Sequence, residues 1–116
     1  MQKIMIDNIK VFGYHGVYDS EREQGQYFNI NIIYNYDYNN PNDEIENVKD
    51  YTEIINYFLD EFNSRKFHLL EELIHYLSSK LKQKFKLDYL KISITKKIAV
   101  KNNKINITIE QEASDG

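Results

Sequence analysis

The order in which the spacing of apolar residues changes along the chain constrains its fold more than any other feature. Alternating apolar residues predict strands over residues 2–12, 28–36, 90–95 and 105–109. Between the second and third of these strands, apolar residues at helical spacing predict two helices, one from Tyr51 and one near Leu70. The order β, β, α, α, β, β predicts an α+β fold, with a four-stranded antiparallel sheet and both helices on one face.

Local signals refine this fold. The apolar phase shifts near Asp7 and Asn8, which predicts a bulge or a short break in the first strand. Asp50 followed by Glu53 is typical of a capping box and places Tyr51 at a helix start. A sheet this small leaves its edges or its second face unpaired, so we expect association with further copies of the chain.

Length and charge limit the class of protein. The 116 residues have the size of one domain, residues 1–116, and the net charge of -3 gives no reason to expect nucleic acid or an anionic membrane as the main partner. The absence of cysteine excludes a disulfide framework and any thiolate site. No segment has the apolar run of a signal peptide or the length of a membrane span, so we expect a soluble cytoplasmic protein.

Three of the four glycines fall within residues 13–25, between the first two predicted strands. Glycine serves where the backbone takes positive φ or where another group approaches closely, so this glycine loop is a shaped connection. It also carries His15 and Glu21, and it is followed by Gln26. The loop alone leaves two interpretations open, a polar crossover on the surface or a functional element.

Four residues could carry chemistry. The alternation of the third strand places Lys96 on its apolar face, where desolvation would favour a neutral amine that acts as a base; alternatively, its side chain reaches water from the strand end. Glu71, in a first helical turn, either compensates the helix dipole or binds a guanidine-like edge of a ligand. Tyr51 either packs or passes a proton, and Glu21 is either solvated or binds a hydroxyl group.

The histidines do not suggest a metal site. The three histidines are His15, His68 and His75, and they form no His-x-His pair. His68 and His75 are seven residues apart on or near one helix, which separates them by two turns, or about 10 Å. The sequence therefore favours chemistry without a metal ion.

Several motifs together resemble one enzyme family. In chain order these motifs are Phe12-Gly-Tyr-His-Gly-Val-Tyr18, Glu21, Gly25-Gln26, Asp50-Tyr51, Leu69-Leu70-Glu71 and Ile94-Thr-Lys96. In this order they resemble the bacterial dihydroneopterin aldolases of the folate pathway, over nearly the whole chain. The resemblance implies the tunnelling fold, in which ββααββ subunits form rings, usually an octamer of two stacked tetrameric rings. It also implies active sites shared between neighbouring subunits.

The resemblance also implies roles for individual residues. Glu71 would bind the amino-pyrimidinone edge of a pterin substrate, helped by backbone groups near Leu70 and Lys49. Lys96 would be the principal acid and base, Tyr51 of the adjacent subunit would assist proton transfer, and Glu21 would contact the hydroxylated side chain of the substrate or the lysine. No cofactor is implied, because the C6=N5 imine of the dihydropterin itself takes up the electrons of the broken bond.

The chain also departs from the family pattern. Lys49 stands in a segment where the family more often has threonine and a small aliphatic residue, which changes the side-chain environment expected around the pterin. Residues 97–101 lack the prolines common in the family, so we expect a looser loop there. Two other functions remain open. One is a dihydroneopterin triphosphate epimerase, with phosphates held by Lys97, Lys101 and Lys104, and the other is a non-catalytic pterin-binding ring protein.

Overall fold

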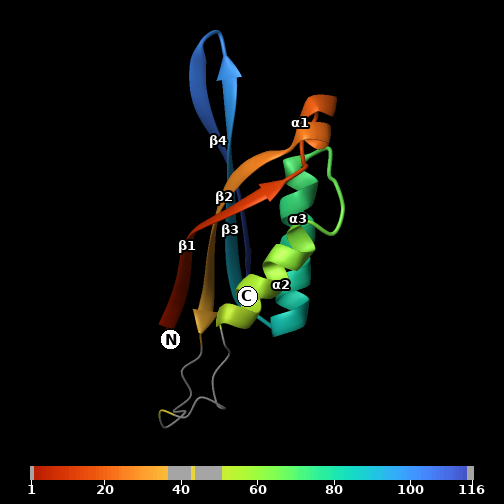
Figure 1. Cartoon of the computed structure of the whole chain (residues 1–116). Helices are drawn as coiled ribbons and strands as arrows, with labels where there is room; N and C mark the ends of the chain where they lie inside the picture. Colours follow the sequence, from red (N-terminus) through yellow and green to blue (C-terminus); the bar gives the residue numbers. More distant parts are fainter. Residues whose placement is uncertain (1, 37–42, 44–50, 115–116) are drawn as a thin grey trace.

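A computed structural model describes residues 2–36, 43 and 51–114 of the chain (Figure 1). In chain order its elements are β1 (Gln2–Gly13), α1 (Asp19–Gln24), β2 (Gln26–Tyr36), α2 (Tyr51–Phe62), α3 (Leu70–Phe85), β3 (Tyr89–Val100) and β4 (Asn103–Ser114). The capping role expected for Asp50 and the substrate contact expected for Lys49 lie outside the described residues.

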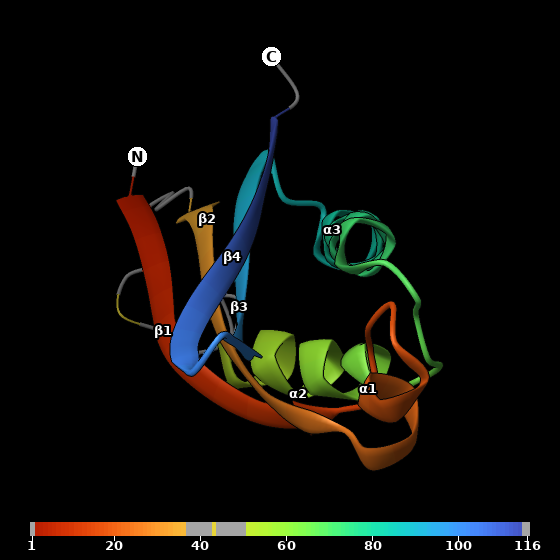
Figure 2. The same ribbon diagram turned by 90° about the horizontal axis from the view of Figure 1, so that it is seen from above.

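The predicted α+β architecture is confirmed. The four strands form one sheet in the order β1-β2-β3-β4, and every neighbouring pair is antiparallel. Helices α2 and α3 both lie on the same face of this sheet, as Figures 1 and 2 show. Strands β1 and β4 are the two edges of the described sheet.

The predicted irregularity in β1 is also confirmed. The β1–β2 register shifts between Ile6 and Ile9, and Asn8 takes a positive φ of 62°. The Asn8 amide donates to the side-chain oxygen of Asn31, at 2.8 Å, instead of continuing the regular ladder. The bulge therefore lets apolar residues with even numbers before it and odd numbers after it lie on the same face of the strand.

The core lies between the sheet and the two long helices. Its fully buried members include Phe28, Ile30, Ile32, Leu90, Ile92 and Ile94 from the strands and Ile54, Phe58, Phe62, Leu73 and Leu77 from the helices. These are the residues that the period-two and helical patterns placed on the apolar faces. Among the described helices, none is long and apolar enough to cross a membrane.

Two features differ from expectation. Helix α1 was not predicted, because its six residues include no apolar side chain and so leave no apolar periodicity in the sequence. The expected loose loop after Lys96 was wrong, since β3 continues to Val100 and pairs with β4 as far as Asn103. A tight turn with positive φ at Lys101 and Asn102 closes this hairpin, whose tip projects beyond the helices (Figure 1).

Candidate active site

The glycine loop is fastened to the helical layer by His15. Its ring is buried, with 1% of its surface exposed; Nε2 lies 2.8 Å from the Phe62 carbonyl oxygen, and Nδ1 accepts the Phe67 amide at 3.1 Å. These partners fix a neutral ring that carries its proton on Nε2. Burial lowers the pKa of His15, although the bond to the Phe62 carbonyl opposes this shift. His15 is therefore a structural residue.

Gly16 shapes the part of the loop next to the site. Its amide donates to the Phe67 carbonyl at 2.9 Å, and its φ of 154° is one that side chains rarely adopt. A Cβ at this position would lie 2.5 Å from the Glu21 Cδ. Arg22 donates to the carbonyl oxygens of Gly16 and Val17, both at 2.7 Å. The loop is thus held in a shape that leaves room for the Glu21 carboxylate.

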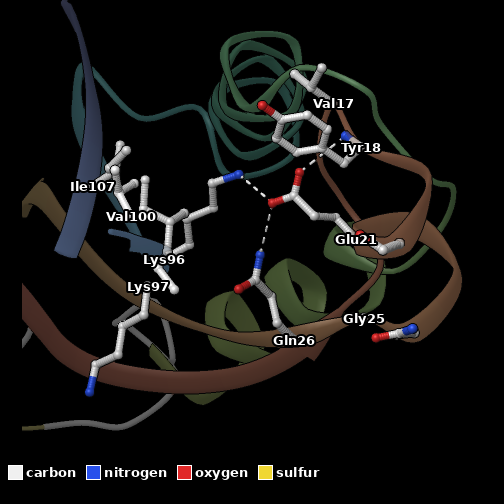
Figure 3. Close-up of a pocket in the computed structure, with 13 residues that line it drawn as sticks. Val17, Tyr18, Glu21, Gly25, Gln26, Lys96, Lys97, Val100 and Ile107 are labelled. Atoms are coloured by element: carbon white, nitrogen blue, oxygen red, sulfur yellow. Dashed lines mark hydrogen bonds and ion pairs between the residues drawn. The ribbon is translucent and has the colours of Figure 1, made fainter. Parts of the chain in front are cut away.

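Glu21 and Lys96 meet although 75 residues separate them. Lys96 Nζ donates to Glu21 Oε2 at 2.7 Å, and only 12% of the Lys96 side chain and 14% of the Glu21 side chain is exposed. The lysine comes from the middle of β3 and the glutamate from α1 (Figure 3). The alternative in which Lys96 extends into water is wrong, because its ammonium is turned toward the carboxylate.

The Glu21 carboxylate has further partners. Oε1 accepts the Tyr18 amide at 3.1 Å, and Oε2 also accepts the Gln26 side-chain amide at 3.3 Å. Burial alone raises the pKa of Glu21, but the hydrogen bonds from Lys96, Tyr18 and Gln26 and the charge of Lys96 outweigh it, so the pKa is lowered. Glu21 is therefore an ionised carboxylate at neutral pH, held against Lys96 Nζ.

The pair lines a cavity of about 540 Å³, within the size range of small-molecule sites. One wall comes from the glycine loop and α1, and the other from the β3–β4 hairpin. The hairpin contributes apolar side chains, including Ile98, Val100 and Ile107 (Figure 3). A partly apolar cavity with a proton-carrying pair at its side can bind a small organic molecule and move protons on it.

The other expected site residues do not line this cavity within the described part of one chain. Tyr51, the first residue of α2, is 58% exposed. Leu70 is buried at the start of α3, and Glu71 is exposed in the first turn of that helix. The Gly16–Phe67 bond ties the segment before α3 to the glycine loop, so this helix start lies on the same side of the molecule as α1 (Figure 1).

Gln26 belongs to a motif of the sequence, but no local pattern indicated a role for its side chain. Its contact with Glu21 depends on α1, which has no apolar signal in the sequence. No group of three or more histidine, aspartate or glutamate side chains suited to a metal ion occurs within the described ranges.

Comparison with known proteins agrees with this fold. The profile of the dihydroneopterin aldolase family, FolB, matches residues 4–110. A dihydroneopterin aldolase of Haemophilus influenzae is 26% identical over 102 residues, which is 86% of each chain.

Two solved structures have the same fold. A FolB structure from Vibrio cholerae superposes with a TM-score of 0.83 at 23% identity, covering 97% of this chain and 98% of that one. The Escherichia coli dihydroneopterin aldolase in complex with neopterin has a TM-score of 0.75 at 21% identity, covering 96% and 99%. The family profile spans nearly the whole chain, and the chain therefore belongs to the dihydroneopterin aldolase family of enzymes.

Proposed function

We propose that this enzyme cleaves 7,8-dihydroneopterin by a retro-aldol reaction to 6-hydroxymethyl-7,8-dihydropterin and glycolaldehyde. The observation that carries the proposal is the Lys96–Glu21 pair, 2.7 Å apart and largely shielded from water at the side of a cavity. Membership of the aldolase family and the neopterin bound to the Escherichia coli relative support the choice of substrate.

The reaction requires a base, an electron sink and an acid. Loss of the proton from the 2'-hydroxyl lets its oxygen form the carbonyl of glycolaldehyde while the C1'–C2' bond breaks. The electrons of that bond move through C1' and C6 to N5 of the dihydropterin, and C1' then takes a proton to give the hydroxymethyl product. Lys96 is the principal acid and base in this scheme, and Glu21 sets the charge beside it and contacts the hydroxylated side chain.

The remaining site residues are proposed to hold the substrate. The Glu71 carboxylate binds the amino-pyrimidinone edge of the pterin, assisted by backbone groups near Leu70 and Lys49. The hydroxyl of Tyr51 from a neighbouring subunit completes the proton transfer, in an octamer of two stacked rings. The exposure of Tyr51 and Glu71 in a single chain supports a site finished by a second copy.

Epimerisation of the substrate side chain is expected to accompany cleavage, since the intermediate can close again. An enzyme acting mainly on the triphosphate would need cations along the phosphates. The Lys97 side chain extends away from the Lys96–Glu21 pair (Figure 3), and Lys101 and Lys104 are exposed at the hairpin tip. These positions do not favour the epimerase over the aldolase.

The test is to incubate purified enzyme with 7,8-dihydroneopterin and, separately, with its triphosphate, and to follow glycolaldehyde and the epimeric products. We expect glycolaldehyde in amounts equal to the hydroxymethyl product, lost in Lys96→Ala and kept in Lys91→Ala, a matched change in a lysine of the same strand that does not line the cavity. Efficient epimerisation of the triphosphate without glycolaldehyde would overturn the proposal in favour of the epimerase. A pterin that binds without turnover would favour a non-catalytic protein.

A further inference from the structure

We propose that Gln26 is a positioning residue of this site, whose side-chain amide holds the Glu21 carboxylate against Lys96. The inference rests on the proposed function for its kinetic consequences, and on the contacts of Glu21 for its physical basis.

Both carboxylate oxygens of Glu21 accept hydrogen bonds. Oε2 accepts both Lys96 Nζ, at 2.7 Å, and Gln26 Nε2, at 3.3 Å, whereas Oε1 accepts the Tyr18 amide at 3.1 Å. Figure 3 shows the Lys96 and Gln26 donors reaching the same oxygen from different sides. The carboxylate cannot rotate about its axis without losing at least one of these bonds.

Glu21 and Gln26 are anchored in different parts of the fold. Helix α1 has no apolar side chain, so apolar packing of this helix does not fix the position of Glu21. Gln26 begins β2 and pairs with Gly13 of β1, so its backbone belongs to the sheet. Gly25, with a φ of 73°, makes the turn between α1 and β2. The Gln26 amide is therefore a direct link from the rigid sheet to the carboxylate on a short helix.

The hydrogen bond from Gln26 also affects the ionisation of Glu21. An amide nitrogen can only donate, so its bond favours the ionised form of Glu21 over the protonated form. Within the described residues, Lys96 on β3 is the charged side chain that faces Glu21, while Arg22 on α1 is turned to the loop carbonyls and Asp19. By keeping Glu21 negative and in place, Gln26 keeps the carboxylate aligned with Lys96 Nζ.

The test compares Gln26→Met with Gln24→Met. Gln24 is an exposed glutamine at the end of α1, and the bonds of Glu21 to the described residues do not include it. Methionine keeps the length of glutamine and removes the donor. For Gln26→Met we expect kcat to fall about 2- to 10-fold, the effect of one lost hydrogen bond, with KM little changed. The acid limb of the kcat/KM profile should move to higher pH, because a bond that lowers the pKa of Glu21 is gone.

A second variant and a second measurement separate positioning from folding. Gln26→Glu keeps the shape and replaces the donor by an acceptor, so it should move the acid limb further than Gln26→Met. The titration of the Glu21 carboxyl carbon, followed by NMR in glutamate-labelled protein and assigned with Glu21→Gln, should move to higher pH in both Gln26 variants and stay in Gln24→Met.

An unmoved Glu21 titration in folded Gln26 variants, or an equal movement in Gln24→Met, would overturn the inference. The titration needs no turnover, so it distinguishes the two proposals. A wild-type enzyme that releases no glycolaldehyde, but in which Glu21 responds to Gln26, would refute the aldolase function and leave the positioning role standing.

Discussion

The two groups of residues expected at the site behave differently within one chain. Glu21 and Lys96 form a shielded pair that the fold of the chain assembles by itself. Tyr51, Leu70 and Glu71 do not line the same cavity in the described part of the chain, and two of them are exposed. The Lys96–Glu21 pair thus forms within one subunit. The proposed pterin contacts would form only when the substrate and a neighbouring subunit are present. Separate changes in the two groups should therefore have separable effects.

The largest effect is expected from Lys96→Ala. Removal of the proposed acid and base should lower kcat about 10²- to 10⁴-fold, while affinity for neopterin is largely kept. Rates come from glycolaldehyde release and affinity from calorimetric titration. If this variant loses neopterin binding as completely as it loses turnover, the division between the two groups of residues fails.

The complementary change is Glu71→Ala. Loss of a charged hydrogen-bonding partner should weaken neopterin binding roughly 10- to 100-fold. Glu72→Ala is the matched control, since Glu72 is also exposed in the first turn of α3. Equal affinities of the two variants in the same titration would remove Glu71 from the pterin site.

Gly16→Ala tests whether the shape of the glycine loop affects both the stability of the fold and the rate of the reaction. A Cβ would crowd the Glu21 side chain at a φ unfavourable for alanine, and should lower the free energy of unfolding by about 1–3 kcal/mol. Displacement of Glu21 should also lower kcat more than it raises KM. A variant that unfolds in urea like the wild type and keeps its kcat would show that the loop tolerates a side chain there.

The smallest effect concerns His15, the loop residue that supports the pair without touching it. Its folded pKa lies below its ordinary value of 6.5, so the unfolded chain binds a proton more readily than the native one. The stabilisation that it gives is complete above about pH 6.5 and is lost as the pH falls below that value, by at most about 1.4 kcal/mol per pH unit. Urea unfolding at pH 8 and pH 5.5 should show a smaller difference for His15→Asn than for the wild type. An unchanged difference would mean that folding does not lower the pKa of His15.

The periodicity of the sequence predicted the sheet and the bulge near Asn8, because each leaves a pattern in local apolar spacing. It also put Lys96 on the correct face of β3. The start of α2 at Tyr51 was predicted from the spacing of Asp50 and Glu53, which is typical of a capping box. The contact between Lys96 and Glu21 joins elements 75 residues apart and follows from no local pattern; only the family resemblance linked them.

The missed features have physical reasons. Helix α1 is held by polar bonds, including those of Arg22, which composition does not reveal. The extension of β3 did leave a signal, since Ile98 and Val100 continue the alternation through Lys96. The exposure of Ile105 and Ile107 could not be foreseen, because the length of the hairpin relative to the helices is a tertiary property.

The His15 bonds also have a consequence for the order of folding. They join the loop to Phe62 and Phe67 across 47 and 52 residues, so they form only after the intervening chain has condensed. The Lys96–Glu21 contact spans 75 residues and carries the same requirement. Competence for chemistry is therefore expected among the last properties that a folding chain acquires.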